Sequence, residues 1–592
     1  MYGLARLVWS KRGLLLALPA ALVAVPSCAR ADAVVTLCDA ADESGSGLNL
    51  LNALLSQPDP STHINTVTFF CNGPATIQVT NPLEIFQATK IDGGNMITLV
   101  GNNTKSLIVV ANPGNSLSLY NLTLRHPTAT PVHCINWLRF GCEGRVVAAN
   151  GDTELNNVTI DSSANAVALT SGTLNIVSSQ FTGNSEAVIT AAPGVSTVTI
   201  TGSVFQNNSG PPIQATGTIN ITDTRFVNND TAFLVGCGQV TIDRSSFQAH
   251  SGAVGALAIG CASATISHTV FQNNRSQDPG GAITSTAPFN TVSITLRADQ
   301  FLNNTSGDRG GAVFWLPPPG NVNRTLTILF SFFTGNKAAS GGAIDIDNAV
   351  DLSGKTSMNI GATAFSGNTA TDAGGAVNAA STELQILRGV FADNTAGRNG
   401  GALFINNSSE LHSIVANSLL VRNGAASGGA FYGADTDFIN STIDSNKGLA
   451  IANIASHTPV HIQFTNSIVS NNPQGGCGPA GLFDDLGNNL QFNGTRTDCG
   501  VSISVADPRL DFMYIPLPLS PPRGNGNLSV CMSPPVSGTD VYGLGRPSGG
   551  ACTIGAVEGD ISILVNGPAA GSTLLQQLLR SVPFGRVTQP PH

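Results

Sequence analysis

Short runs in which apolar and polar residues alternate recur through the middle of the chain. Val, Ile and Phe take every second position and Thr, Ser or Asn the positions between, as in strands with one buried face. The runs are TVTIT at 197–201, TINITDTRF at 218–226, QVTIDRSSF at 239–247, ATISHTVF at 264–271 and TVSITLRADQF at 291–301. After the N-terminal segment, helical periodicity is limited to GLNLLNALLSQ at 47–57. The pattern predicts an all-β protein with at most one short helix near its N-terminus.

Two motifs repeat in step with these runs. Phe-x-x-Asn begins at 181, 205, 226, 271, 301, 333, 365 and 391, with a variant from Phe247 to His250 and degenerate copies at Leu420, Ile443 and Ile468. Gly-Gly-Ala begins at 280, 310, 341, 374, 400 and 428. Successive Phe positions lie 21 to 32 residues apart, which is a solenoid period. Gly-Gly-Ala follows its Phe (or Leu420) by 8 or 9 residues, but the next repeat begins 17 to 24 residues later. One corner of each coil is therefore fixed, and the opposite side absorbs insertions.

Short strands at this period, about three to a turn, predict a parallel β-helix. Coils stack at about 4.8 Å, so equivalent residues form columns along the rod. We expect Phe to fill the interior and Asn amides to hydrogen-bond from coil to coil. The Gly pair would supply a positive φ, or a close backbone approach, where a Cβ atom would clash. About 14 coils would make a rod on the order of 70 Å long.

The first 31 residues have the layout of a secretory signal. Basic residues at Arg6, Lys11 and Arg12 precede the apolar segment GLLLALPAALVAVP, and ARA at 29–31 supplies the small residues of a cleavage site. We therefore expect export through a cleaved signal and a mature chain that starts at Asp32.

Two other interpretations of this segment stay open. A membrane anchor is disfavoured because the apolar run is short and contains Pro19 and Pro26. A lipoprotein would use Cys28, although Pro26 fits a lipobox poorly. No later segment is apolar enough to predict a membrane span.

The cysteines that follow the signal fall into pairs that are close in sequence. These pairs are Cys38 with Cys71, Cys134 with Cys142, Cys237 with Cys261, Cys477 with Cys499 and Cys531 with Cys552. An even number in an exported chain predicts disulfides, with buried free thiols as the alternative. Cys237 and Cys261 would lie one coil apart, at a Cα distance that suits a disulfide. Because C-x-x-C and matching His spacing are absent, we expect no metal centre of that kind.

Composition narrows the classes of partner. Charged residues make up 11% of the chain, against roughly 25% in typical soluble proteins. The net charge is −9, and no Lys/Arg cluster follows the N-terminal segment. Because nucleic-acid binding needs concentrated positive charge, we expect no nucleic-acid partner. With 42% hydrophobic residues, the chain is not a disordered polyelectrolyte.

The paired motifs also resemble a known repeat. Phe-x-x-Asn with Gly-Gly-Ala, over about residues 170–475, is similar to the repeat of polymorphic outer membrane proteins and of other bacterial surface β-helix proteins. ATKIDGGNMITLVGNN at 88–103 resembles the opening coils of pectate-lyase-like β-helices. CGPAGLFDDLGNNLQFNGTRTDCG at 477–500, DPRL at 507–510 and GRPSGGACTIGAVE at 545–558 resemble the terminal module of choice-of-anchor proteins. The resemblance implies export, a right-handed β-helix and a variable attachment device, but no reaction.

We therefore expect an all-β chain built on one right-handed parallel β-helix. The predicted parts are a signal at 1–31, an N-terminal cap with the first strands at 32–87, the repeats at 88–475, a disulfide-bearing C-terminal module at 476–558 and a tail at 559–592. The tail is too short for an autotransporter barrel and carries no sortase motif, so the mode of attachment is left open. Caps are expected at both ends because open coils expose pairing edges.

Asp345 and Asp347 are the first candidate site. They alternate with Ile344 and Ile346, so both carboxylates should point away from the core. Two acids on one face could bind Ca²⁺ or act as a glycosidase pair. Sister coils place Thr284, Phe314, Asn378, Phe404 and Tyr432 at the position of Asp345, so no second acid follows in this column. We predict solvated side chains, with Ca²⁺ binding or catalysis as the alternative.

Aromatic residues are the second candidate. Phe314, Phe404 and Tyr432 share the column of Asp345, and Trp315 leads into the rigid segment LPPPG, which we expect to stand out from the face. Outward rings on a flat β face could stack on sugars, unless the variable loops cover them.

Signatures of β-helix enzymes are absent. We find no Asn-Thr-Asp, Gly-His-Gly or Arg-Ile-Lys motif, and no histidine stands in a nucleophile motif. No catalytic residue is therefore assigned. The sequence predicts an adhesin-like protein that is secreted or associated with the cell surface or outer membrane, and whose partners would be glycans or host and cell-surface molecules. The alternative is a polysaccharide lyase or glycoside hydrolase, which a cleft holding three or more acids with an Arg or Lys would favour.

Overall fold

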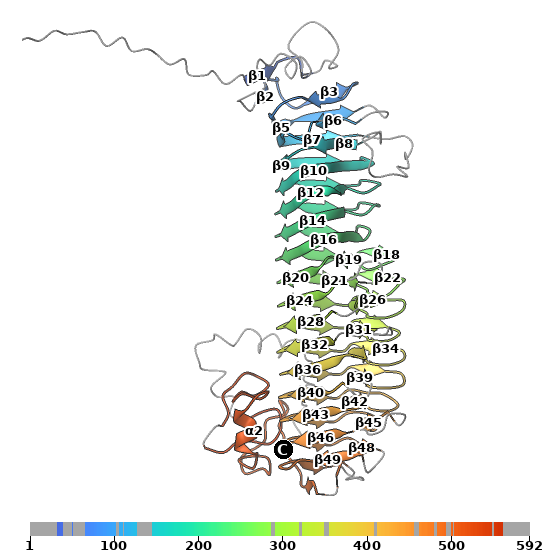
Figure 1. The fold of residues 1–592 in the computed structure, drawn as a ribbon, viewed down its shortest axis with the longest axis vertical. Helices are drawn as coiled ribbons and strands as arrows, with labels where there is room; N and C mark the ends of the chain where they lie inside the picture. Colours follow the sequence, from blue (N-terminus) through green and yellow to red (C-terminus); the bar gives the residue numbers. More distant parts are fainter. Residues whose placement is uncertain are drawn as a thin grey trace, which may run out of the picture.

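The computed structural model shows a long rod of stacked coils with a lobe on the side of its last coils (Figure 1). The structure describes residues 32–38, 50, 65–101, 106–110, 112–126, 145–285, 291–318, 322–347, 355–407, 411–454, 461–478, 482–492, 499–500, 502–547 and 550–559. The predicted signal, and the tail beyond residue 559, lie outside these residues. The prediction of an all-β fold is confirmed, because the rod consists of parallel strands.

Three columns of strands run along the rod. Sheet I contains β20 (Ser263–Ser267), β24 (Ser293–Arg297), β28 (Arg324–Leu329), β32 (Thr356–Gly361), β36 (Glu383–Leu387), β40 (Ser413–Ala416), β43 (Thr436–Ile439), β46 (Ile462–Thr465) and β49 (Phe483–Asp485). Sheet II contains β11 (Gln180–Thr182), β13 (Val204–Gln206), β15 (Arg225–Val227), β17 (Ser246–Gln248), β21 (Val270–Gln272), β25 (Gln300–Leu302), β29 (Phe332–Thr334), β33 (Ala364–Ser366), β37 (Val390–Ala392), β41 (Leu419–Val421), β44 (Thr442–Asp444), β47 (Ile468–Ser470), β50 (Leu490–Phe492) and β51 (Ser504–Val505). Sheet III contains β19 (Leu257–Gly260), β23 (Ile283–Ser285), β27 (Val313–Trp315), β31 (Ile344–Ile346), β35 (Val377–Ala380), β39 (Leu403–Asn406), β42 (Phe431–Gly433), β45 (Ile451–Asn453) and β48 (Cys477–Gly478).

The first coils are built differently from the later ones. Long strands there span the places of both sheet III and sheet I, and β16 pairs with β19 and with β20. They are β10 (Asn165–Val177), β12 (Ile189–Thr201), β14 (Ile213–Thr222) and β16 (Ala232–Asp243). Before them, β5 (Thr89–Gly101), β7 (Leu117–Arg125) and β9 (Thr153–Asp161) span the places of sheets I and II instead. Around these strands lie β1 (Asp32–Val35), β2 (Asn65–Phe69), β3 (Ala75–Val79), β4 (Leu83–Ile85), β6 (Ile108–Val110) and β8 (Arg145–Asn150).

The Phe and Asn of the repeat form two interior columns, as the sequence predicts. The rings from Phe181 to Phe391 stack with centroids 4.5 to 5.0 Å apart. Asn amides donate to the Asn of the next coil along most of the column, for example from Asn304 Nδ2 to Asn336 Oδ1 at 3.0 Å. His250 replaces one member of this ladder, and its ring nitrogens lie beside main-chain carbonyl oxygens.

The Gly-Gly-Ala corner lies between sheets II and III. The first Gly adopts a left-handed conformation, as Gly341 does at φ 59°, and a Cβ there would lie 2.2 Å from the carbonyl oxygen of Ile344. A second, narrow sheet runs along this corner. It contains β18 (Ser251–Gly252), β22 (Arg275–Ser276), β26 (Thr305–Ser306), β30 (Lys337–Ala338), β34 (Thr369–Ala370) and β38 (Thr395–Ala396).

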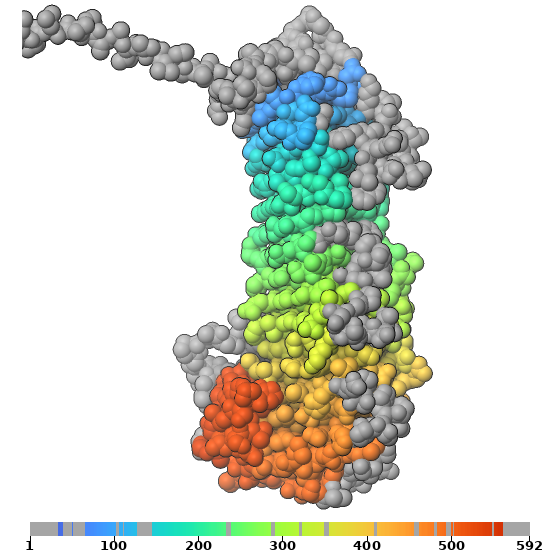
Figure 2. Space-filling model, in the orientation of Figure 1, coloured from blue at the N-terminus to red at the C-terminus, as the bar shows by residue number. Residues whose placement is uncertain are grey.

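The segment after β51 folds back along the rod and forms the lobe. It contains the short helix α2 (Leu528–Met532) and covers the outer face of sheet II in the last coils (Figure 2). Four corner residues with positive φ donate from their amide nitrogens to main-chain oxygens of the lobe: Asn417 to Val536, Asn440 to Thr553, Asn466 to Asn527 and Asn488 to Asn525. Asn tolerates this left-handed backbone, so it serves both the corner and the lobe.

Three of the predicted disulfides are confirmed: Cys38–Cys71, Cys477–Cys499 and Cys531–Cys552. Cys261 is also disulfide-bonded, whereas the side chain of its expected partner Cys237 lies outside the described residues. Cys134 and Cys142 lie outside them as well.

Candidate binding site on the outer column of sheet III

The residues that the sequence aligned with Asp345 do lie in one column. Adjacent strands pair them in register in the order Thr284, Phe314, Asp345, Asn378, Phe404, Tyr432, Ala452 and Gly478. We call this set the outer column, because the residues on either side of it in each strand point into the core. The exposed fraction of the side chain differs widely among the members of the outer column.

The prediction that Asp345 is solvated is wrong. The residue is 0% exposed, although Ile344 and Ile346 point into the core as expected. Alternation shows that Asp345 lies on the outer face of sheet III, but not which segment packs over that face. The Gly-Gly-Ala corner packs over Asp345, since a Cβ at Gly341 would lie 2.8 Å from the Cβ of Asp345. Asn378 Nδ2 donates to Asp345 Oδ2 at 2.7 Å. Burial raises the pKa of Asp345 to about 7, because a charge is costly away from water.

Asp347 is only partly exposed, and it is paired. Its Oδ2 contacts Arg309 Nη1, which comes from the Gly-Gly-Ala corner of the preceding coil. Its main-chain N–H donates to Trp315 O at 3.3 Å. The cation beside Asp347 is therefore a guanidinium. Among the described residues, no group of three or more His, Cys, Asp or Glu is placed to hold a metal ion. Ca²⁺ at Asp345 and Asp347 stays an untested prediction.

Trp315 does not stand out from the rod. It is 0% exposed and packs in the core, with Nε1 donating to Thr291 O at 3.0 Å. Val313 points inward, so the alternation that turns Phe314 outward returns Trp315 to the inside. Phe314 itself is only 5% exposed. Neither residue can meet a ligand in this conformation.

Phe404 and Tyr432 are the two aromatic residues of the column that reach solvent. Both are half-buried, and their rings stack with centroids 5.6 Å apart and planes 7° apart. Each therefore covers one face of the other. The next residue beyond Tyr432 is Ala452, followed by Gly478, so the column drops to its smallest side chains at this point. Both small residues are buried: Ala452 is 3% exposed, and a Cβ at Gly478 would lie 2.8 Å from the side chain of Leu449.

A strip of paired histidines and acids lies along sheet I, and the sequence did not predict it. His412 Nε2 lies 3.0 Å from Asp437 Oδ2, and His461 Nδ1 lies 3.1 Å from Asp484 Oδ2. The hydrogen bond to Asp437 raises the pKa of His412. His412 and His461 precede Ser413 and Ile462, which lie two coils apart in one register. Only the register between coils reveals the strip, because the partners in its two pairs are 25 and 23 residues apart in the chain.

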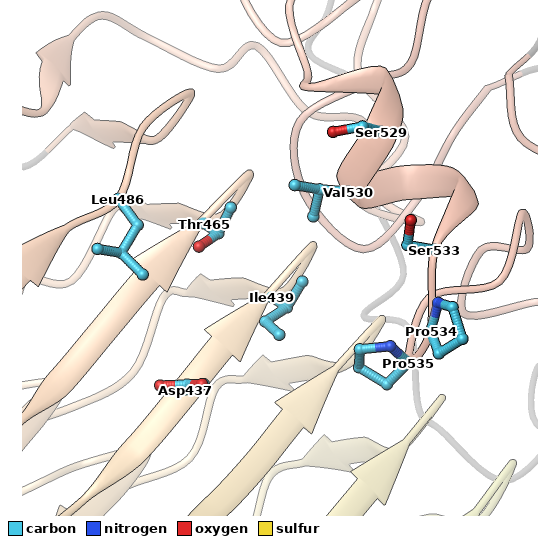
Figure 3. A pocket seen from close by; sticks show the side chains of 9 residues that line it. All are labelled: Asp437, Ile439, Thr465, Leu486, Ser529, Val530, Ser533, Pro534 and Pro535. Carbon is cyan, nitrogen blue, oxygen red and sulfur yellow. The ribbon is translucent and has the colours of Figure 1, made fainter.

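A cleft of about 300 Å³ lies between this strip and the lobe (Figure 3). Asp437, Ile439, Thr465 and Leu486 line it from the rod, and Ser529, Val530, Ser533, Pro534 and Pro535 line it from α2 and the segment after it. Of the acids near the strip, only Asp437 lines the cleft. Its described lining therefore contains one acid, not the three that would favour an enzyme.

A second hollow, of about 430 Å³, lies where the narrow corner sheet begins. Polar groups from three successive coils line it, including Asn207, Asn228 and Asp230. Asn228 Nδ2 donates to Asn207 Oδ1 at 2.9 Å. No aromatic ring lines this hollow.

Comparison with known proteins identifies the fold but no activity. Residues 144–307 match a family model described as the right-handed β-helix region. No curated protein and no solved structure matches the chain. Together with the parallel register of the strands, the match shows a right-handed parallel β-helix. No helix among the described residues is long and apolar enough to cross a membrane.

Proposed function

We propose that the protein is an exported, adhesin-like rod that binds carbohydrate at the outer column of sheet III. The observation that carries the proposal is the stacked pair Phe404 and Tyr432, which ends at a step lined by Ala452 and Gly478. A pyranose ring has an apolar C–H face, and it would continue the stack by lying on the second face of Tyr432.

Two features outside the site agree with this function. The signal-like segment and the disulfides suit an oxidising, extracellular setting. The stacked coils present one rigid face, which suits a binding surface along the rod. The ligand would lie along the rod axis, because the column runs in that direction.

The test is binding of the purified mature chain to a glycan array, followed by calorimetry with a retained glycan. We expect Tyr432→Ala to weaken binding at least tenfold and Phe404→Ala to weaken it less, since Phe404 acts by supporting the Tyr432 ring. Phe86→Ala is the matched control, because Phe86 is 55% exposed and lies in the first coils. Equal affinity of Tyr432→Ala and the wild-type protein would exclude this site.

A second candidate function is cleavage of a polysaccharide, favoured by the His412–Asp437 pair beside the cleft. A histidine with a raised pKa can deliver a proton to a leaving group. A reducing-sugar assay over a polysaccharide panel tests it. Turnover that His412→Gln abolishes would make the protein an enzyme, whereas turnover unaffected by His412→Gln would exclude this pair.

A further inference from the structure

Asp345 and Asn378 form a directly paired carboxyl and amide on adjacent strands of sheet III. One hydrogen bond joins them, from Asn378 Nδ2 to Asp345 Oδ2 at 2.7 Å. The two remaining oxygen atoms, Asp345 Oδ1 and Asn378 Oδ1, are buried and have no hydrogen-bond partner among the described residues. An ionised carboxylate and an amide oxygen both only accept hydrogen bonds. The pair therefore lacks one donor.

The described surroundings do not supply that donor. The charged groups that face Asp345 are Arg309, Asp347 and Asp308. Two of them are acids, which disfavour a negative charge on Asp345. Arg309 is the only cation of the three, and it is paired with Asp347. On the other side, the neighbour in register is Phe314, whose side chain has no polar atom.

We propose that a proton on Asp345 Oδ1 is the missing donor, so that neutral Asp345 and Asn378 form a cyclic pair with two hydrogen bonds. In this pair Asn378 donates through Nδ2 to Asp345 Oδ2, and Asp345 donates through Oδ1 to Asn378 Oδ1. Every buried polar atom of the pair is then satisfied, as buried groups generally are. The raised pKa of Asp345, about 7, agrees with a carboxyl group that holds its proton near neutral pH.

The pair has a consequence for the binding site, and this step rests on the proposed function. Asn378 is the neighbour in register of Phe404, so it forms the wall of the aromatic stack on that side. While Asp345 is protonated, both polar atoms of the Asn378 amide are held toward Asp345. Loss of the proton leaves two hydrogen-bond acceptors, Asp345 Oδ1 and Asn378 Oδ1, facing each other, and the Asn378 side chain beside Phe404 becomes less firmly held. We therefore expect the site to be ordered below neutral pH and looser above it, which makes Asp345 a positioning residue.

Asp345→Asn tests the proton directly, because its amide carries a permanent donor at the same place. Folded Asp345 keeps its proton to higher pH than the unfolded chain does, so this residue lowers stability as pH rises from about 4 through 7. We expect the Tm of Asp345→Asn to match the wild-type value near pH 4 and to exceed it increasingly toward pH 8. Asp299→Asn is the matched control. Asp299 is also buried with a pKa of about 7, but both of its oxygens accept main-chain N–H groups, so the substitution should lower Tm.

Infrared spectroscopy gives a second readout, which reports the proton on the carboxyl group itself and not the stability of the protein. The wild-type spectrum at pH 6 minus that of Asp345→Asn should contain a protonated-carboxyl C=O band that fades as pH rises through 7. Absence of the band at pH 6 would overturn the proposal. So would a rise in wild-type Tm on adding CaCl₂ at pH 8 that Asp345→Asn does not show, because a cation would then bridge the two oxygens. Neither readout involves a glycan, so failure here is distinguishable from failure of the proposed binding function.

Discussion

Two acids buried in the rod have the same raised pKa but opposite hydrogen-bond environments. One oxygen of Asp345 has no hydrogen-bond partner within the described part of the chain, whereas Asp299 accepts the main-chain N–H of Thr269 at 2.8 Å and that of Arg297 at 2.9 Å. Burial is the largest cause of both shifts, and the N–H groups oppose it at Asp299. A raised pKa alone therefore does not identify which acid lacks a donor.

The contrast makes a prediction for Asp299→Asn. The new amide nitrogen would face one of the two N–H groups and leave a buried donor without a partner. We expect the free energy of unfolding at pH 6 to fall by about 1–3 kcal/mol. Urea unfolding measures it, and a gain in stability would contradict the hydrogen-bond assignment at this residue.

His250 interrupts the Asn ladder and makes a second prediction at this scale. Its main-chain N–H reaches Asn274 Oδ1 at 3.1 Å, but its side chain makes no bond to that amide oxygen. His250→Asn restores the ladder bond, and we expect a gain of about 1 kcal/mol at pH 7. Burial lowers the pKa of His250, so the wild-type protein loses stability as pH falls below about 6.5. The gain should therefore grow toward pH 5, and a constant gain would contradict the buried, neutral imidazole.

The sequence predicted residue positions correctly where they depend on periodicity. It failed where burial depends on which other segments pack over a residue. The columns of Phe, Asn and Gly follow from spacing alone. The same alternation, continued one residue past Phe314, would have placed Trp315 in the core. The burial of Asp345 had no such signal, because it depends on the corner at Gly341 and on neighbouring coils. The His412–Asp437 pair requires the register between coils, which variable loops hide.

At the scale of elements, the lobe changes the outer face of sheet II. One outer column of this sheet runs in register from Gln206 and Val227 through Ala392 to Val421. Ala392 and Val421 are apolar and pack against the lobe, where Val421 is 1% exposed, and the column then continues through Asp444 and Ser470 to Phe492. The change from polar to apolar residues at these outward positions of sheet II is visible in the sequence. It could have predicted that this face is covered, although not which segment covers it.

Val421→Lys should detach the lobe. A lysine there would force a longer, charged side chain into the contact that Val421 makes with the lobe, so we expect a loss of at least about 2 kcal/mol and faster proteolysis between residues 506 and 559. Val227→Lys is the matched control, because Val227 occupies the same column where the lobe does not reach. Unfolding and limited proteolysis measure both variants. Equal effects at the two positions would mean that the lobe does not protect Val421.

At the scale of the whole molecule, two described disulfides close the two ends of the rod. Cys38–Cys71 ties the first coil, and Cys477–Cys499 ties the last. Between them, stability comes from contacts between neighbouring coils, as in other repeat proteins. Each link closes a loop of moderate length, which is worth roughly 3 kcal/mol.

Reduction should therefore loosen the ends first. We expect hydrogen exchange in a reducing buffer to speed up in residues 65–70 and 477–492, while sheets I and II between residues 293 and 421 stay protected. The control is the same reductant with the Cys pairs replaced by Ala, where reductant should add nothing. A uniform loss of protection along the rod would show one cooperative unit instead.

We propose that the rod binds a glycan beside Tyr432. Hydrogen exchange of the full mature chain, with and without a glycan retained in the array, tests this site. We expect new protection in peptides that contain Tyr432 and Ala452, and none in residues 529–535 beside the cleft. Protection at 529–535 without change at Tyr432 would place the ligand in the cleft and contradict the claim.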